Sequence, residues 1–134
     1  MTGPSTVASL AALLADMFGG AIAEVHGDGA TRISTVTHDS RAVNSGSLFA
    51  CLRGERVDGH DFAAAAVAAG AAALLVDHRL DAGTVGGVAQ LVVDDTRLRL
   101  GPISASLVGD PSTRMTTVGI TGTNGKTTTS LMLE

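Results

Sequence analysis

A stretch of fifteen residues without a charged side chain, 62–76, most restricts how this chain can fold. A helix that crosses a bilayer needs about 20 apolar residues, so the stretch is too short to span a membrane. Gly70 also divides it. We therefore expect a helix that begins near Asp61 and ends at Gly70, with the glycine in a left-handed conformation. A buried strand should follow from Ala72 to Val76.

Other segments alternate between helical and strand patterns. Ser5 can cap a helix in which Val7, Leu10, Leu14 and Met17 recur at three- and four-residue steps, and Gly19-Gly20 ends it. Thr96 can cap a helix that continues to about Leu107. Pro102 inside this helix predicts a break near Gly101-Pro102, or a helix that starts at Pro102. Further strands are expected at 31–37, 48–52, 90–93 and 118–121. The alternation predicts an α/β layer fold with a largely parallel or mixed sheet.

Composition excludes several classes of function. Charged residues make up 16% of the chain and its net charge is -4, so the basic surface of a nucleic-acid-binding protein is absent. The aromatic residues are three Phe, which argues against a platform for stacking bases or sugars. Residues 7–18 are apolar but follow no Lys or Arg, which excludes a secretory signal. Cys51 is the single cysteine and lies in an apolar run, which favours a buried small hydrophobe over a reactive thiol and fits a reducing cytosol.

The motif with the clearest chemistry is a glycine-rich turn between an apolar strand and a helix. It consists of Gly122, Thr123, Asn124, Gly125, Lys126, Thr127 and Thr128. Glycines let main-chain N–H groups approach phosphate oxygens, and the start of a helix adds unpaired N–H groups and a partial positive charge. Lys126, the candidate catalytic residue, would reach the terminal phosphates of a bound nucleotide, and the Thr127 hydroxyl would coordinate Mg²⁺. Ile120 stands where the strict P-loop pattern has its first glycine.

A second set of residues narrows the function further. Its members follow one another between positions 39 and 71: Asp39-Ser40-Arg41, Gly46, Leu48-Phe49, Gly54, Asp58-Gly59-His60, Phe62, Ala66 and Gly70-Ala71. Together with Gly109-Asp110-Pro111-Ser112 and the glycine-rich turn, this order resembles the Mur ligase family. Within the family it is most similar to the ligases that add the third amino acid to UDP-N-acetylmuramoyl-dipeptide. The resemblance covers about residues 31–134.

The resemblance implies two domains and a substrate site. Residues 1–110 would form the domain that binds the UDP-muramoyl substrate, and 111–134 the linker and the start of a P-loop ATP-binding central domain. The substrate contacts carried over from the family are His38, Ser40, Glu55, Arg56 and Val57. His38 stands where the family often has Leu, so the resemblance implies a substrate contact from its main chain and not from its side chain.

The same residues also have structural interpretations. Asp39-Ser40 can form a side-chain turn that ends a strand, and Arg41 can be an ion-pair partner. Asp58-Gly59 is more typical of a turn than of a ligand site. His60 stands just before the expected helix, where a role in the loop or the helix cap is favoured over a catalytic one. His26, His38, His60 and His78 are scattered, and no group of His, Cys and carboxylates has the spacing of a zinc site.

The activity that the resemblance implies is an ATP-dependent ligation in cytoplasmic peptidoglycan synthesis. ATP would phosphorylate the terminal carboxylate of UDP-N-acetylmuramoyl-L-Ala-D-Glu, and the amine of diaminopimelate or lysine would attack the acyl phosphate. The amino acid would bind through a C-terminal domain after Glu134, so we expect the chain to be an inactive N-terminal fragment. No nucleic acid, membrane or obligate protein partner is indicated. The alternatives are a D-Ala-D-Ala-adding Mur ligase and a non-catalytic nucleotide-sugar-binding module.

Overall fold

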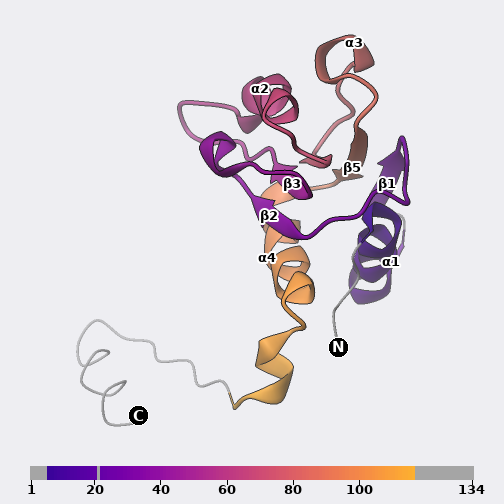
Figure 1. Ribbon diagram of the computed structural model, residues 1–134. Coiled ribbons are helices and arrows are strands. Elements are labelled where there is room, and N and C mark those ends of the chain that lie inside the picture. Colours follow the sequence, from indigo (N-terminus) through magenta and orange to yellow (C-terminus); the bar gives the residue numbers. More distant parts are fainter. Residues whose placement is uncertain (1–5, 21, 117–134) are drawn as a thin grey trace, which may run out of the picture.

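A computed structural model describes residues 6–20 and 22–116, and these form a five-stranded sheet between helices (Figure 1). The strand order is β1-β5-β4-β3-β2, in which β1 is antiparallel to β5 and the other four strands are parallel. The strands are β1 (Ala23–His26), β2 (Thr35–Thr37), β3 (Ser47–Ala50), β4 (Ala73–Val76) and β5 (Ala89–Val93). The mixed α/β fold expected from the sequence is confirmed. The predicted strand 118–121 and the glycine-rich turn 122–128 lie outside the described residues.

Helices cover both faces of the sheet. Strands β2 to β5 lie side by side in chain order, so right-handed crossovers return each connection over the same face. That face carries α2 (Ala63–Ala68), α3 (Ala82–Val85) and the 3-10 turns η1 (Ser40–Ala42) and η2 (Gly59–Phe62). The other face carries α1 (Val7–Phe18) and α4 (Thr96–Leu107). Figure 1 shows these two groups of helices on opposite sides of the strands.

The two central strands are buried along their whole length. In β3, Leu48 and Ala50 pack toward α1 and α4, while Phe49 and the following Cys51 pack toward α2 and α3. Strand β4 alternates in the same way, with all four residues buried. Burial on both faces explains why the sequence around β4 carries no charge, as in other parallel sheets covered by helices.

The uncharged stretch folds largely as expected. A 3-10 turn begins at Gly59, α2 continues it to Ala68, and Gly70 has a φ of 109°. A side chain is strained in that left-handed region, so glycine lets the chain turn directly from helix to strand. Strand β4 then starts one residue later than expected.

Helix α1 matches its predicted pattern with one exception. The side chain of Thr6 accepts a hydrogen bond from the Ser9 N–H and caps the helix, whereas Ser5 lies outside the described residues. Gly19 ends the helix, as expected. Met17 is 53% exposed and is not part of the core, because the apolar contact of α1 with the sheet ends near Leu14.

One predicted strand is shorter than expected, and one strand was missed. The strand expected at 31–37 is β2 at Thr35–Thr37 only, because Thr31 and Arg32 pair with the start of α1 instead of with β3. Strand β1 was missed, since it has only four residues, Ala23–His26, in which apolar and polar side chains alternate. The short helix α3 was missed as well.

The prediction of a break at Gly101-Pro102 is wrong. Helix α4 runs from Thr96 to Leu107 with Pro102 inside it. Pro102 has no N–H to bond the Leu98 carbonyl, but Leu98 is 63% exposed, so the missing bond lies on the exposed side of the helix. The cap is the carboxylate of Asp95, which accepts from the Leu98 N–H, and Thr96 is the first helical residue.

The described chain ends in a short 3-10 turn, η3 (Pro111–Arg114), which follows Asp110 with a φ of 48°. The boundary placed after residue 110 remains a prediction. Within the described ranges, no helix has the length and apolar character needed to cross a membrane.

Candidate functional site

Polar side chains follow each of the four parallel strands at one edge of the sheet. His38 comes after β2, Arg53 lies three residues beyond β3, Asp77 follows β4 and Asp94 follows β5. We call this the carboxyl edge, since it holds the carboxyl ends of these strands. Ligands of open α/β sheets bind outside this kind of edge.

Two adjoining hollows lie at the carboxyl edge. One has a volume of about 270 Å³ and is lined by His38, Asp39, Ser40, Arg41, Phe49 and Phe62. The other has a volume of about 340 Å³ and is lined by His38, Leu52, Gly54, Val57, Gly59, Phe62 and Arg97. His38 and Phe62 line both, so the two hollows form one surface that we call the double hollow. Three of the five residues predicted to contact substrate, His38, Ser40 and Val57, therefore lie together.

The other two predicted contacts lie on a tight loop beside the double hollow. The Gly59 N–H donates to the Leu52 carbonyl at 2.7 Å, and the Gly54 N–H donates to the Val57 carbonyl at 2.9 Å. Glu55 and Arg56 are exposed at the tip of this loop and are not among the lining residues. A Cβ at Gly59 would lie 2.5 Å from the Leu52 nitrogen, so only glycine lets the two strands of the loop close.

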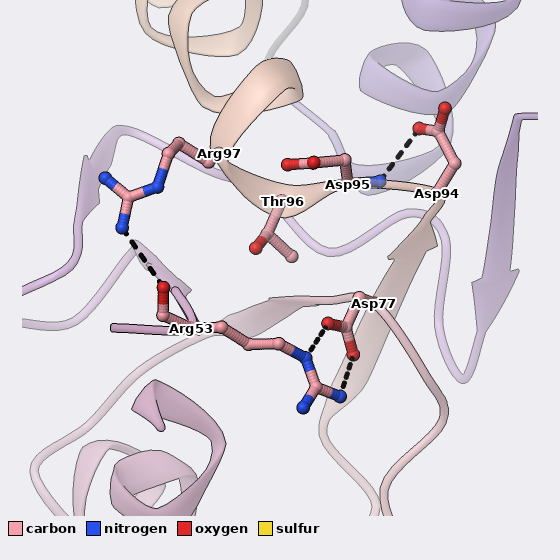
Figure 2. Close-up of a pocket in the computed structure, with 6 residues that line it drawn as sticks. All are labelled: Arg53, Asp77, Asp94, Asp95, Thr96 and Arg97. Carbon is pink, nitrogen blue, oxygen red and sulfur yellow. Dashed lines mark hydrogen bonds and ion pairs between the residues drawn. The ribbon is translucent and has the colours of Figure 1, made fainter. Parts of the chain in front are cut away.

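A network of charged side chains fastens this loop to β4. The Arg53 guanidinium donates to both carboxylate oxygens of Asp77 (Figure 2) and to Asp58 at 3.2 Å. His60 has only 5% of its side chain exposed, and its Nδ1 lies 2.6 Å from the Asp58 carboxylate. The Asp77 N–H donates to Nε2 of the same ring at 3.3 Å. Both ends of the loop are thus held at the start of the segment after β4.

This arrangement changes the ionisation of the two carboxylates. Hydrogen bonding from Arg53 lowers the pKa of Asp77 from 3.8 to about 2, even though partial burial opposes the shift. Hydrogen bonds from the main chain and side chain of His60 lower the pKa of Asp58. Both carboxylates are therefore charged at neutral pH and hold the loop by charge-assisted hydrogen bonds.

A third hollow, of about 150 Å³, borders the first turn of α4 (Figure 2). Its floor includes Thr96, whose hydroxyl donates to the Cys51 carbonyl at 2.9 Å in a buried hydrogen bond. That bond, rather than the expected capping role of Thr96, fixes the start of α4 against the end of β3. Arg97 lies next to it and lines both this hollow and the double hollow.

The structural interpretations of several motif residues are confirmed. The Asp39 carboxylate accepts from the Arg41 N–H and starts η1, and it also pairs with the Arg41 guanidinium at 2.9 Å. Asp58 starts η2 in the same way by accepting from the His60 N–H. Cys51 is fully buried, and burial raises the pKa of its thiol to about 12, as for an inert buried cysteine.

The interpretation of the histidines as scattered is wrong for two of them. The rings of His60 and His78 stack with centroids 4.6 Å apart, and Asp77 lies beside both. The sequence hides this cluster because the sheet, not local spacing, brings η2 next to the end of β4. Both nitrogens of His60 already have partners and Arg53 occupies both oxygens of Asp77, so the arrangement fits a structural network rather than a metal site.

Phe62 and Arg97 line the double hollow but were not predicted to contact substrate. Phe62 is 43% exposed despite standing in an apolar run, so it offers aromatic surface to the hollow although the composition argued against a stacking platform. Arg97 stands at the second position of a helix, where nothing in the local pattern distinguishes it from a surface arginine. Its position relative to β3 could be found only from the fold.

The Asp77 network gives a prediction for stability. The pKa of Asp77 is lower in the folded protein than in the unfolded chain, so its contribution to the free energy of unfolding is complete above about pH 4 and disappears as the pH falls toward 2. We expect Asp77→Asn to be less stable than the wild-type chain at pH 7, and the difference to shrink as the pH falls over that range. Urea unfolding at several pH values measures it.

Asp16→Asn is a matched control, because Asp16 is exposed on α1 and the charge change is the same. It should leave the free energy of unfolding nearly unchanged at every pH. A constant gap between Asp77→Asn and wild type from pH 7 to pH 2 would contradict the assignment of the network.

Comparisons with known proteins show which family this chain belongs to. The family model described as "Mur ligase family, catalytic domain" matches residues 32–104. The UDP-N-acetylmuramoyl-L-alanyl-D-glutamate–2,6-diaminopimelate ligase of Streptomyces coelicolor is 45% identical over 108 residues, which are 80% of this chain and 21% of the relative. The ligase of the same name from Chlorobaculum tepidum is 46% identical over 116 residues, 85% of this chain and 23% of the relative. The chain thus spans about a fifth of the length of these relatives.

Solved structures show the same relationship. A UDP-N-acetylmuramoylalanyl-D-glutamyl-2,6-diaminopimelate–D-alanyl-D-alanyl ligase from Acinetobacter baumannii superposes with a TM-score of 0.71 and 34% identity, and the match covers 99% of this chain and 28% of that one. A MurF ligase from Thermotoga maritima in complex with ADP has a TM-score of 0.53 and 29% identity over 74% of this chain and 21% of that one. With a family model that matches more than half of its residues, this chain belongs to the Mur ligase family.

Proposed function

We propose that this chain supplies the UDP-binding part of an ATP-dependent ligase that adds the third amino acid to UDP-N-acetylmuramoyl-L-Ala-D-Glu, in cytoplasmic peptidoglycan precursor synthesis. The observation that supports it most directly is the double hollow at the carboxyl edge. Two segments that were predicted to contact substrate meet there: residues 38–40, and Val57 of the loop that also carries Glu55 and Arg56.

The lining of the double hollow suits a uridine nucleotide. The face of Phe62 and the side chain of Val57 offer apolar surface for the pyrimidine ring. Ser40 offers a hydroxyl, and within the described residues this hydroxyl has no protein hydrogen-bond partner. A few polar groups set into a mostly apolar concave surface are typical of small-molecule sites.

The second part of the proposal concerns ATP. Residues 122–128 would bind its phosphates, with Lys126 at the terminal phosphates and Thr127 holding Mg²⁺. The relation to a ligase solved with ADP supports ATP as the nucleotide. The substrate carboxylate would become an acyl phosphate, and the amine of the incoming amino acid would attack it. That amino acid would bind through residues beyond those of this chain.

The relatives also bear on which ligase this is. The curated relatives at 41–46% identity are all named for adding 2,6-diaminopimelate, which favours that amino acid over lysine. The solved D-alanyl-D-alanyl ligase from Acinetobacter baumannii is less similar, at 34% identity. We therefore keep the D-Ala-D-Ala-adding activity as the second candidate.

The uridine site is tested by Ser40→Ala. Loss of one neutral hydrogen bond should weaken binding of UDP to this chain by about 1 kcal/mol, roughly a fivefold rise in Kd. Calorimetric titration measures it. Ser45→Ala is the control, because Ser45 is exposed in the turn before β3, at the opposite edge of the sheet. Equal affinities for UDP in the Ser40 variant and the wild type would count against the carried-over contact.

The ATP site is tested by Lys126→Ala in the full-length ligase that carries this chain. Lys126 is the only lysine of the chain, and its charge would be lost from the terminal phosphates in the transition state. The rate of ligation with diaminopimelate as the amino acid, measured by phosphate release, should fall by about 100-fold or more, while UDP binding is retained. Normal turnover would remove the P-loop assignment. Absence of any ligation in the wild-type protein, with UDP binding intact, would favour the non-catalytic module.

A further inference from the structure

Three arginines line the hollows of the carboxyl edge, and they differ in their partners. Arg41 is paired with Asp39, and Arg53 is paired with Asp58 and Asp77. Arg97 forms no ion pair within the part of the chain that the structure describes. The one hydrogen bond of its side chain there is donated by Nη2 to the main-chain oxygen of Arg53 at 3.2 Å. Arg97 is therefore the one of the three whose charge is not neutralised by a neighbouring carboxylate.

The acidic residues nearest to Arg97 in sequence form hydrogen bonds with other groups. Asp94 accepts two hydrogen bonds from the Arg99 guanidinium, the longer of them 2.8 Å. Asp95 caps α4 by accepting from the Leu98 N–H at 3.0 Å. Figure 2 shows the Arg97 side chain directed toward the Arg53 main chain and away from Asp94. The guanidinium thus has neither carboxylate as a partner, and Arg97 lines the double hollow.

The position of Arg97 is fixed by the fold. Its neighbour Thr96 donates a buried hydrogen bond to the Cys51 carbonyl, which ties the first turn of α4 to the end of β3. The hydrogen bond to Arg53 then places the Arg97 guanidinium at the base of the loop that carries Glu55 and Arg56. An arginine held in this way loses less conformational entropy when it binds an anion.

The site next to Arg97 has one apolar part and one cationic part. Phe62 and Val57 line the double hollow together with Arg97. The remaining guanidinium N–H groups of Arg97 can bind phosphate oxygens in a forked arrangement. A ligand with an aromatic base at one end and a phosphate group at the other matches these two parts of the site.

We propose that Arg97 is a specificity-determining residue that binds the diphosphate of the uridine nucleotide while the base occupies the part of the double hollow next to Phe62. This inference rests on the proposed function, since it assumes a uridine nucleotide in the double hollow. It adds a contact from the start of α4 to the two segments identified by sequence.

Binding of three ligands to the 134-residue chain tests the assignment. UDP, UMP and uridine share the base and ribose and differ in phosphate charge. Arg97→Ala should raise the Kd for UDP by about tenfold or more, the Kd for UMP by less, and the Kd for uridine by less than twofold. Arg97→Lys should recover part of the UDP affinity, because it keeps the charge but loses the forked geometry.

Arg32→Ala is the matched control. Arg32 is exposed and precedes β2, so it lies toward the opposite edge of the sheet and its loss changes the net charge by the same amount. Its affinity for UDP should equal that of the wild type, and thermal unfolding should show that all three variants remain folded.

The outcomes separate the two proposals. If the wild-type chain binds UDP and Arg97→Ala binds it equally well, the role of Arg97 is overturned and the uridine site stands. An equal loss of affinity for uridine and UDP also overturns it, since the residue would then act on the base or on the fold. If the wild-type chain binds neither UDP nor uridine, the uridine site itself is overturned, and this inference with it.

Discussion

Burial of β3 and β4 on both faces is the constraint on which the rest of the structure depends. Their side chains alternate between the contact with α1 and α4 and the contact with α2 and α3, so each face of the sheet needs its own layer of helices. Parallel strands that are covered in this way cannot be joined by tight turns. Each connection must cross a face, and all four carboxyl ends of β2 to β5 therefore arrive at one edge.

Within the described residues, the carboxyl edge combines ion pairs with one arginine, Arg97, that lines the double hollow without a carboxylate partner. Arg53 and Asp77 join the ends of β3 and β4, and the lowered pKa of Asp77 keeps that pair charged at neutral pH. The pair holds the loop around residues 55–57 without itself offering a free charge to a ligand. Arg97 provides that charge from α4. The same edge thus separates the residues that stabilise the loop from those available to bind substrate.

The sequence was sufficient for features that depend on local pattern. The uncharged stretch with Gly70 predicted α2 and β4. The contact of Ser40 with substrate came from the family resemblance and stays a prediction, although Ser40 does line the double hollow. Features that depend on contacts between distant segments could not be predicted. Asp77 and His60 meet only because η2 packs beside the end of β4, and Pro102 is tolerated in α4 because the hydrogen bond it cannot form lies on the exposed side of the helix.

The central claim is that the double hollow binds a uridine nucleotide, and the most direct measurement is a titration of the isotope-labelled chain with UDP, followed by amide NMR shifts. The account predicts shifts that saturate at residues 38–40, 54–62 and 97, where the lining segments meet. Amides at the opposite edge, such as Gly46 and Gln90, should be unchanged. Saturable shifts confined to that opposite edge, or no shifts with UDP at millimolar concentration, would contradict it.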